Sequence, residues 1–340
     1  SSTAVYGARG ANGVVIITTK KGSSGKPSVS YNGYYGQKTQ AHMPNMMSSR
    51  QFYDLYKDEE RFGRGFTAQE LYNVENDITT DWLDLVSQEA IQQNHTISVS
   101  GGSDSTTYNF SAGKQLEEGL VTGNDYTRLS LNAGVESQVS DKMKVGFTAY
   151  LTENERNWGS HEAVRSAMRA RPTATPFFDD IVNANKRDTN FGPVGPYAFY
   201  MGINDSQVIN PLVEIHPDNY QRQNRSNSLI ANVYLEYEIT PGLKFKTSYS
   251  GYNNNIREGE YRGTFTKSRK GSRSPIASTN QFKTSNYTID NTLTYQAEFG
   301  KHSINATALA SIFEEYNEQI GLAVEDLPYK SLWHSLGTGA

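Results

Sequence analysis

The connecting segments of this chain alternate in length, and this regularity constrains the fold more than any single motif. Between segments in which apolar and polar residues alternate, the connections are in turn long, tight, medium, tight, very long, tight, long and tight. In an up-and-down antiparallel sheet every second connection lies at the same end, so one end carries only tight turns. That asymmetry is typical of a transmembrane antiparallel up-and-down β-barrel, with short periplasmic turns and long extracellular loops.

Segments with a period of two predict about nine strands. The first covers residues 29–35, and the longest alternating face covers residues 229–239 and ends at Thr240-Pro241-Gly242. The others are expected at residues 94–100, 107–112, 129–135, 145–151, 243–249, 287–299 and 304–312. A small, odd set of strands cannot close the even-stranded barrel expected of a single bacterial chain, so we expect more strands in a longer polypeptide.

Composition narrows the class of protein. The 340 residues include no cysteine, which excludes disulfide frameworks and thiol catalysis and suits export through the oxidising periplasm. No apolar run is long enough for a helical membrane span, whereas a mean hydropathy of -0.65 is compatible with a barrel, because only alternate strand residues face lipid. The formal charge of -4, with both signs interspersed, argues against nucleic acid as the main partner.

Two long connections differ in character. Residues 39–89 have helical spacing, with Ser48 or Ser49 and Asp81 as expected N-caps, so short helices are predicted there. Residues 154–225 lose the alternation and hold more than half of the 11 prolines, which predicts a long structureless connection. Such a connection requires a functional reason in a compact domain, and an extracellular barrel loop supplies one.

No catalytic motif is present. Paired carboxylates such as Glu117-Glu118 and Asp179-Asp180 lie in loops or at loop edges, where solvated charge is the expected role. The six histidines show no metal-ligand spacing, and neither HExxH nor GxSxG occurs. The sequence therefore predicts no enzyme, no metal and no cofactor.

Aromatic residues concentrate in the very long connection. Trp158, Tyr197, Phe199 and Tyr200 are candidates for contact with a ligand or partner, because aromatic rings stack on sugars and grip peptide side chains at little entropic cost. The alternative is that these rings pack the loop against itself and a partner. A basic loop over residues 257–273 is expected to be a solvated charged loop; the alternatives are contact with lipopolysaccharide phosphates or with an acidic partner.

The first 22 residues form the most specific motif of the chain. A glycine-rich bend leads into the β-branched run at residues 14–19, which predicts a buried strand; a phosphate-binding loop would require a helix there. The stretch resembles the end of the plug domain in the SusC/RagA-like family of TonB-dependent outer-membrane transporters. The matching residues are Ser2-Thr3-Ala4, Tyr6-Gly7-Ala8-Arg9, Ala11-Asn12-Gly13-Val14, Ile17-Thr18-Thr19-Lys20 and Lys21-Gly22.

The resemblance implies a domain layout and partners. Residues 1–24 would end the plug, and residues 25–340 would form the first part of a barrel of 22 strands, with extracellular loops at about 39–90, 154–225 and 257–281. It implies a bacterial outer-membrane location, contact with outer-membrane lipid and a SusD-like surface lipoprotein, in a dimer of such pairs. TonB would act through an N-terminal part that precedes Ser1.

Arg9, Gly10, Gly13 and Lys20 are the expected plug-to-barrel contacts, since a charge inside a barrel needs a partner. Candidate partners on the lumen side are Asn132, Glu236, Glu238, Lys244, Lys246, Asp290 and Glu298.

Three functions follow from these observations. The first is TonB-dependent import of oligosaccharides or peptides. The second is a SusC-like structural scaffold within a larger outer-membrane assembly, in which loops and plug hold partners. The third is a soluble all-β adhesin or enzyme.

Overall fold

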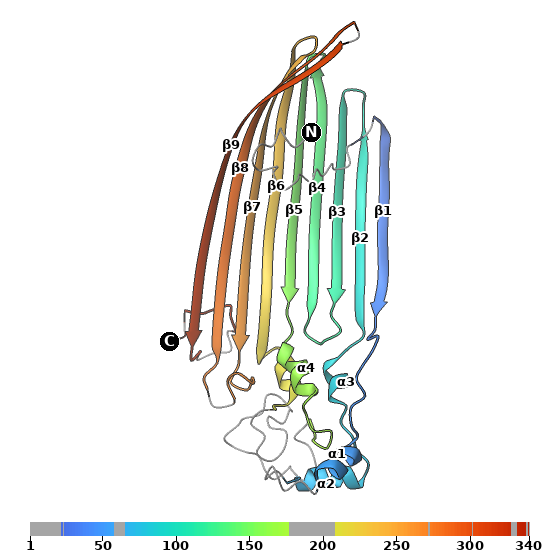
Figure 1. Cartoon of the computed structure of the whole chain (residues 1–340), viewed down its shortest axis with the longest axis vertical. Coiled ribbons are helices and arrows are strands. Elements are labelled where there is room, and N and C mark those ends of the chain that lie inside the picture. The colour runs from blue at the N-terminus through green and yellow to red at the C-terminus, as the bar shows by residue number, and fades with distance from the viewer. Residues whose placement is uncertain are drawn as a thin grey trace.

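The chain forms one antiparallel sheet of nine strands. The computed structural model describes residues 22, 24–57, 65–176, 208–270, 273–300, 302–327, 332–337 and 339. The strands pair in chain order, each antiparallel to the next (Figure 1). They are β1 (Gly25–Lys38), β2 (Ala90–Gly102), β3 (Thr106–Glu118), β4 (Asp125–Ser140), β5 (Met143–Asn157), β6 (Tyr220–Thr240), β7 (Leu243–Arg262), β8 (Ile276–Phe299) and β9 (His302–Glu325).

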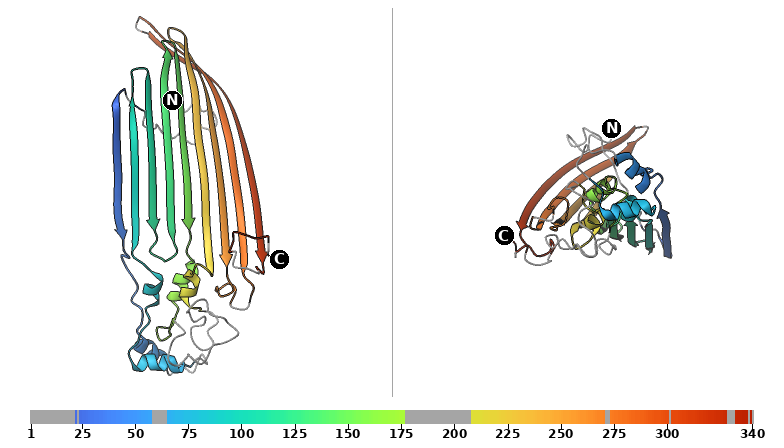
Figure 2. Two further views of the ribbon diagram at one scale, coloured as in Figure 1. Left: turned by 180° about the vertical axis from the view of Figure 1, so that it is seen from behind. Right: turned by 90° about the horizontal axis from the view of Figure 1, so that it is seen from below.

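The sheet is curved and open. Seen from below, its strands follow an arc (Figure 2), and the terminal strands β1 and β9 each pair with one neighbour only. The predicted all-β, up-and-down architecture and its partial barrel of about nine strands are therefore confirmed. The strand predicted at residues 14–19 lies outside the described residues.

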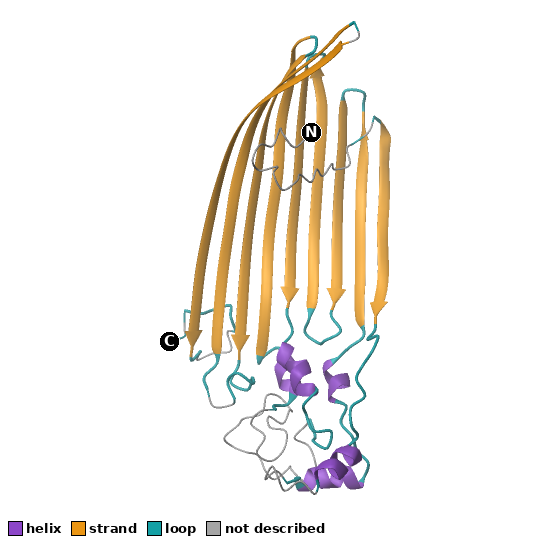
Figure 3. Cartoon of the chain, in the orientation of Figure 1, coloured by secondary structure: helices purple, strands orange, loops and turns teal. Residues whose placement is uncertain are grey.

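Tight turns and long connections lie at opposite ends of the sheet, as predicted (Figure 3). Two residues, Pro241 and Gly242, separate β6 from β7. Gly242 has a φ of 81°, in the left-handed region, and Pro241 before it fixes the φ that the preceding turn position prefers. The turn chemistry visible in the sequence therefore sets this hairpin.

The two faces of the sheet differ in polarity. Ile97, Ala112, Leu131, Leu151 and Leu229 are cross-strand partners from β2 to β6 and form one apolar row. The neighbouring row of cross-strand partners, one residue away on every strand, lies on the opposite face. It consists of Ser98, Ser111, Asn132, Tyr150 and Ile230. Because side chains alternate between faces, an apolar face and a mainly polar face run through the sheet.

Short helices occupy the connections at the long-loop end. The connection between β1 and β2 holds α1 (Ser49–Tyr56), α2 (Ala68–Glu75) and α3 (Trp82–Val86). Ser48 caps α1 in a capping box with Gln51, and Asp81 caps α3, which confirms the helical prediction. The β5–β6 connection holds α4 (His161–Ala167) and α5 (Pro211–Ile215), so the expectation of a wholly structureless segment was wrong.

The strands extend further than the alternation predicts. The β5–β6 and β7–β8 connections cover residues 158–219 and 263–275, shorter than the expected 154–225 and 257–281. At the loop-side ends of β5, β6 and β7, which the alternation did not predict as strand, Glu155 pairs with Arg225 and Arg225 pairs with Arg257. These residues lie on the face that is apolar in the middle of the sheet. Both faces are polar there, so hydrophobic periodicity no longer marks the strand.

Hydrophobic cores lie at the long-loop end. One buried cluster joins α3, α4 and α5 and consists of Trp82, Leu83, Val86, Ala163, Ala167, Ala170, Ala174, Val208 and Leu212. Within the described part of the chain, no helix is long and apolar enough to span a membrane.

Candidate functional site

Of the predicted ligand-contact residues and the predicted plug residues, the structure describes only one. Arg9, Gly10, Gly13, Lys20, Tyr197, Phe199 and Tyr200 lie outside the described residues, and Trp158 lies within them.

Trp158 directly follows β5 at the long-loop end. Its backbone N–H donates to the carbonyl of Arg222 on β6 at 2.8 Å, which continues the ladder beyond Asn157. The Arg156 guanidinium lies 3.7 Å from the centre of the indole ring, and that of Arg222 lies 5.5 Å from it. Trp158 as a whole residue is 36% exposed, and two cations flank its ring. Sequence reasoning identified the tryptophan but missed both arginines, since only the strand register brings Arg222 beside it.

A second polar cluster lies near the tight turns, on the same face. Lys144 of β5 forms an ion pair with Glu136 of β4 at 2.6 Å, and the Tyr234 hydroxyl of β6 donates to the same carboxylate. The Lys246 ammonium lies 4.4 Å from the centre of the Tyr234 ring. The strand register places all the predicted lumen-side candidates on this polar face: Asn132, Glu236, Glu238, Lys244, Lys246, Asp290 and Glu298.

A buried ion pair holds the loops together. Glu70 on α2 is 2% exposed, and its carboxylate accepts hydrogen bonds from Arg171 at 3.2 Å and Thr173 at 2.9 Å. The Trp82 indole N–H on α3 donates to the Arg171 carbonyl at 2.9 Å. These contacts attach the β1–β2 connection to the β5–β6 connection.

A second carboxylate joins the β5–β6 and β7–β8 connections. Glu214 on α5 accepts hydrogen bonds from the Ser160 hydroxyl and from the Lys267 backbone N–H, both at 2.6 Å. The Lys267 ammonium also forms a 2.7 Å ion pair with Glu162. Burial raises the pKa of Glu214. Burial also acts to raise the pKa of Glu162, but the hydrogen bonds and positive charges of Lys267 and Arg165 outweigh it, so the pKa of Glu162 is lowered.

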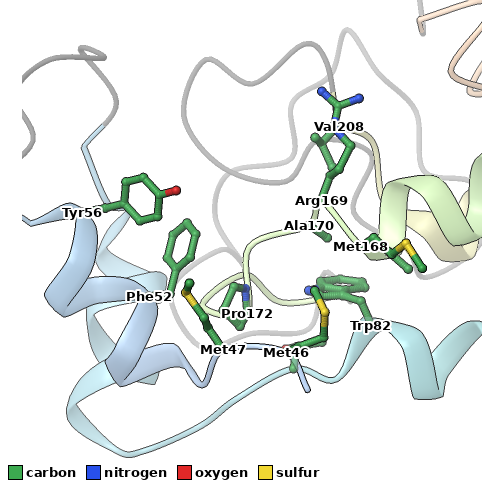
Figure 4. A pocket seen from close by; sticks show the side chains of 12 residues that line it. Met46, Met47, Phe52, Tyr56, Trp82, Met168, Arg169, Ala170, Pro172 and Val208 are labelled. Atoms are coloured by element: carbon green, nitrogen blue, oxygen red, sulfur yellow. The ribbon is translucent and has the colours of Figure 1, made fainter. Parts of the chain in front are cut away.

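The loop cluster contains an apolar pocket of about 390 Å³ (Figure 4). Residues from α1 and the segment before it form one side, and Trp82 with residues that follow α4 forms the other. The lining residues are Met46, Met47, Phe52, Tyr56, Thr80, Trp82, Ala167, Met168, Arg169, Ala170, Pro172 and Val208. The sequence did not indicate this pocket, because its walls come from connections far apart in the chain.

Among the residues that the structure describes, no group of three or more His, Cys, Asp or Glu side chains is arranged to hold a metal ion.

No protein-family model matches the chain. It is 27% identical over 331 residues to "TonB-dependent receptor P3" of Formosa agariphila, a match that covers 94% of this chain and 30% of that protein. It is also 27% identical over 267 residues to "TonB-dependent receptor SusC" of Bacteroides thetaiotaomicron, covering 74% of this chain and 25% of that protein.

Among solved structures, the RagAB peptide transporter superimposes with a TM-score of 0.76 at 20% identity. The match covers 99% of this chain and 40% of that one. Over most of its length the chain is similar to SusC/RagA-like TonB-dependent receptors.

The relatives suggest which environment suits each face of the sheet. TonB-dependent receptors of the SusC/RagA type are outer-membrane β-barrel proteins and not enzymes. In such barrels the apolar strand residues face lipid and the polar strand residues face the lumen. Trp158 with its two arginines lies at the end that carries the long loops, and Arg156 and Arg222 belong to the polar face of the sheet. The chain spans about a third of the length of the curated relatives it matches.

Proposed function

We propose that the full-length receptor imports oligosaccharides or peptides across the bacterial outer membrane, driven through TonB and assisted by a SusD-like surface lipoprotein. The observation that carries this proposal is the sheet itself, with a lipid-facing apolar face, a polar face and every long connection at one end. The similarity to a receptor named SusC and to a peptide transporter supports the cargo classes.

In this proposal residues 1–24 end the plug, and residues 25–340 form the first part of the barrel wall. Arg9, Gly10, Gly13 and Lys20 contact the wall, and the cluster of Glu136, Lys144, Tyr234 and Lys246 is a polar surface suited to receiving a charged plug. The loop end is extracellular, and its exposed pocket and Trp158 serve the cargo or the lipoprotein.

The loops are built to keep one shape. Two buried carboxylates, Glu70 and Glu214, tie three separate connections to one another. A preorganised surface loses less entropy when it binds, which favours recognition of a specific cargo or partner. The proposed assembly is a dimer of transporter–lipoprotein pairs.

The experiment is affinity purification of the full-length receptor in detergent with its co-purifying proteins, followed by binding to oligosaccharide and peptide pools. We expect retention of one cargo class together with a lipoprotein, and uptake of that cargo by cells that is lost when TonB is deleted. Recovery of several envelope proteins with no retained cargo would instead support the structural scaffold.

A further inference from the structure

Three arginines form a diagonal row on the polar face, which runs from the loop end into the sheet. Arg222 stands on β6, Arg156 on β5 and Arg128 on β4. In the ladder Arg156 pairs with Asn224, two residues from Arg222, and Arg128 pairs with Asn154, two residues from Arg156. Each arginine is therefore one diagonal step, on the order of 7–8 Å between Cα atoms, from the next.

These guanidinium groups have no carboxylate partner among the residues that the structure describes. The Arg128 guanidinium donates to the Tyr150 hydroxyl at 2.5 Å, and Arg156 and Arg222 lie over the Trp158 ring. By contrast, Arg225, on the opposite face of β6, forms a 3.2 Å ion pair with Glu155.

The carboxylates nearest in the register are engaged elsewhere. Glu117 forms a 2.9 Å ion pair with Lys38, Glu258 accepts from the Asn224 amide at 3.0 Å, and Glu260 accepts from Arg262 at 3.0 Å. None of these carboxylates forms an ion pair with the three arginines, although Glu260 stands opposite Arg222 in the ladder. A guanidinium stacked on an aromatic face keeps the N–H donors along its edge free, and this edge matches a carboxylate in a two-pronged hydrogen bond.

We infer that Arg222, Arg156 and Arg128, with Trp158, bind a carboxylate group of the cargo as it enters the lumen. This inference rests on the proposed import function and names its substrate class: a cargo that carries carboxylates, either uronic acids on an oligosaccharide or the carboxyl groups of a peptide. Trp158 supplies the face on which a sugar ring or apolar side chain next to the carboxylate stacks.

The test compares matched acidic and neutral probes on the full-length receptor with its co-purified partner. One pair of probes is a peptide pool with free C-terminal carboxylates and the same pool amidated. The other is a uronic-acid oligosaccharide pool and its carboxyl-reduced form. We expect one acidic pool to be retained about tenfold or more above its neutral counterpart, with a preference that weakens as salt rises.

The variants are Arg156→Gln combined with Arg222→Gln, and Arg225→Gln as the matched control on the opposite face. The double variant should lose the preference for acidic probes while its thermal unfolding stays unchanged, and the control should keep the preference. Equal retention of acidic and neutral probes by the wild type, or equal loss in the Arg225→Gln control, would overturn the inference and leave import standing. Failure of every probe to bind would overturn both.

Discussion

The loop cluster and the sheet differ in where their large apolar side chains lie. In the loop cluster Trp82 is 3% exposed, and its neighbours form a conventional hydrophobic core. In the sheet the large apolar side chains face outward, as for Leu131, which is 42% exposed. Water drives apolar side chains inward, as in the loop cluster, whereas an apolar face turned outward is the pattern of a barrel wall that meets lipid.

The comparison also applies to charge. The loop cluster buries an ion pair between Glu70 and Arg171, where water cannot screen it. In the middle of the sheet and near its tight turns the ion pairs lie on the polar face, as for Glu136 and Lys144, whose side chains are 23% and 32% exposed. Substitutions should therefore have large effects in the loops when they break buried pairs, and in the sheet when they place charge toward lipid.

The largest expected effect comes from removing a partner of the buried pair. Arg171→Ala leaves the Glu70 carboxylate buried without its cation, which should destabilise the loop cluster by about 3–5 kcal/mol. Hydrogen exchange of α2 in the full-length receptor measures this loss. The control is Arg165→Ala, whose exposed ion pair with Glu162 should contribute about 0–1 kcal/mol. Equal protection in the two variants would contradict a structural role for the buried pair.

A charge toward lipid should come next. Leu131→Arg places a cation on the apolar face and should lower the unfolding free energy in phospholipid vesicles by about 2–4 kcal/mol, depending on its depth. Asn132→Arg, one residue along β4 on the lumen face, should have a much smaller effect. Urea titration of the full-length receptor in vesicles measures both, and a larger loss for Asn132→Arg would reverse the assignment of the two faces.

Helix capping tests the loops on a smaller scale. Ser48→Ala removes the hydroxyl that accepts from the Gln51 backbone N–H at 3.2 Å, and should destabilise α1 by about 1 kcal/mol. Arg50→Ala, at an exposed position of the same helix, serves as the control. Exchange rates of the α1 amides should rise about fivefold in the first variant and change little in the second.

A pH change gives the mildest test, because no side chain is removed. The pKa of Glu214 is raised above its ordinary value of 4.5, so the closed loops bind a proton that the opened loops release. The stability of this contact should therefore fall as pH rises from 4.5 through the raised pKa. Glu162, with its lowered pKa, contributes stability that is lost only below 4.5.

Hydrogen exchange of the Lys267 amide, corrected for the intrinsic effect of pH, measures how the stability of the Glu214 contact changes with pH. Glu214→Gln should make the exchange protection nearly independent of pH above 4.5, because it removes the titrating group and keeps an acceptor oxygen. A pH dependence that persists unchanged in this variant would assign the titration to another group.

Part of the site could be read from the sequence. Trp158 was predicted as a binding residue from its type and its place in an aromatic connection, and this remains a prediction. The alternation also assigned Glu236 and Lys244 to one face of the sheet, and the strand register places both on the polar face. The arginines beside Trp158 could not be found this way, because Arg156 and Arg222 belong to different strands separated by the longest connection. Their proximity depends on the register of β5 against β6.

The sequence by itself determined the number of strands, their alternating faces, the tight turns and the caps of α1 and α3. These features follow from interactions between residues close in the chain: the period of two, the Pro241-Gly242 turn and the Ser48 capping box. Only the tertiary structure decided how the loops meet. Glu70 and Arg171 are 101 residues apart in the sequence. They form an ion pair because the tertiary structure buries both side chains at the same place, and no local sequence pattern specifies that pairing.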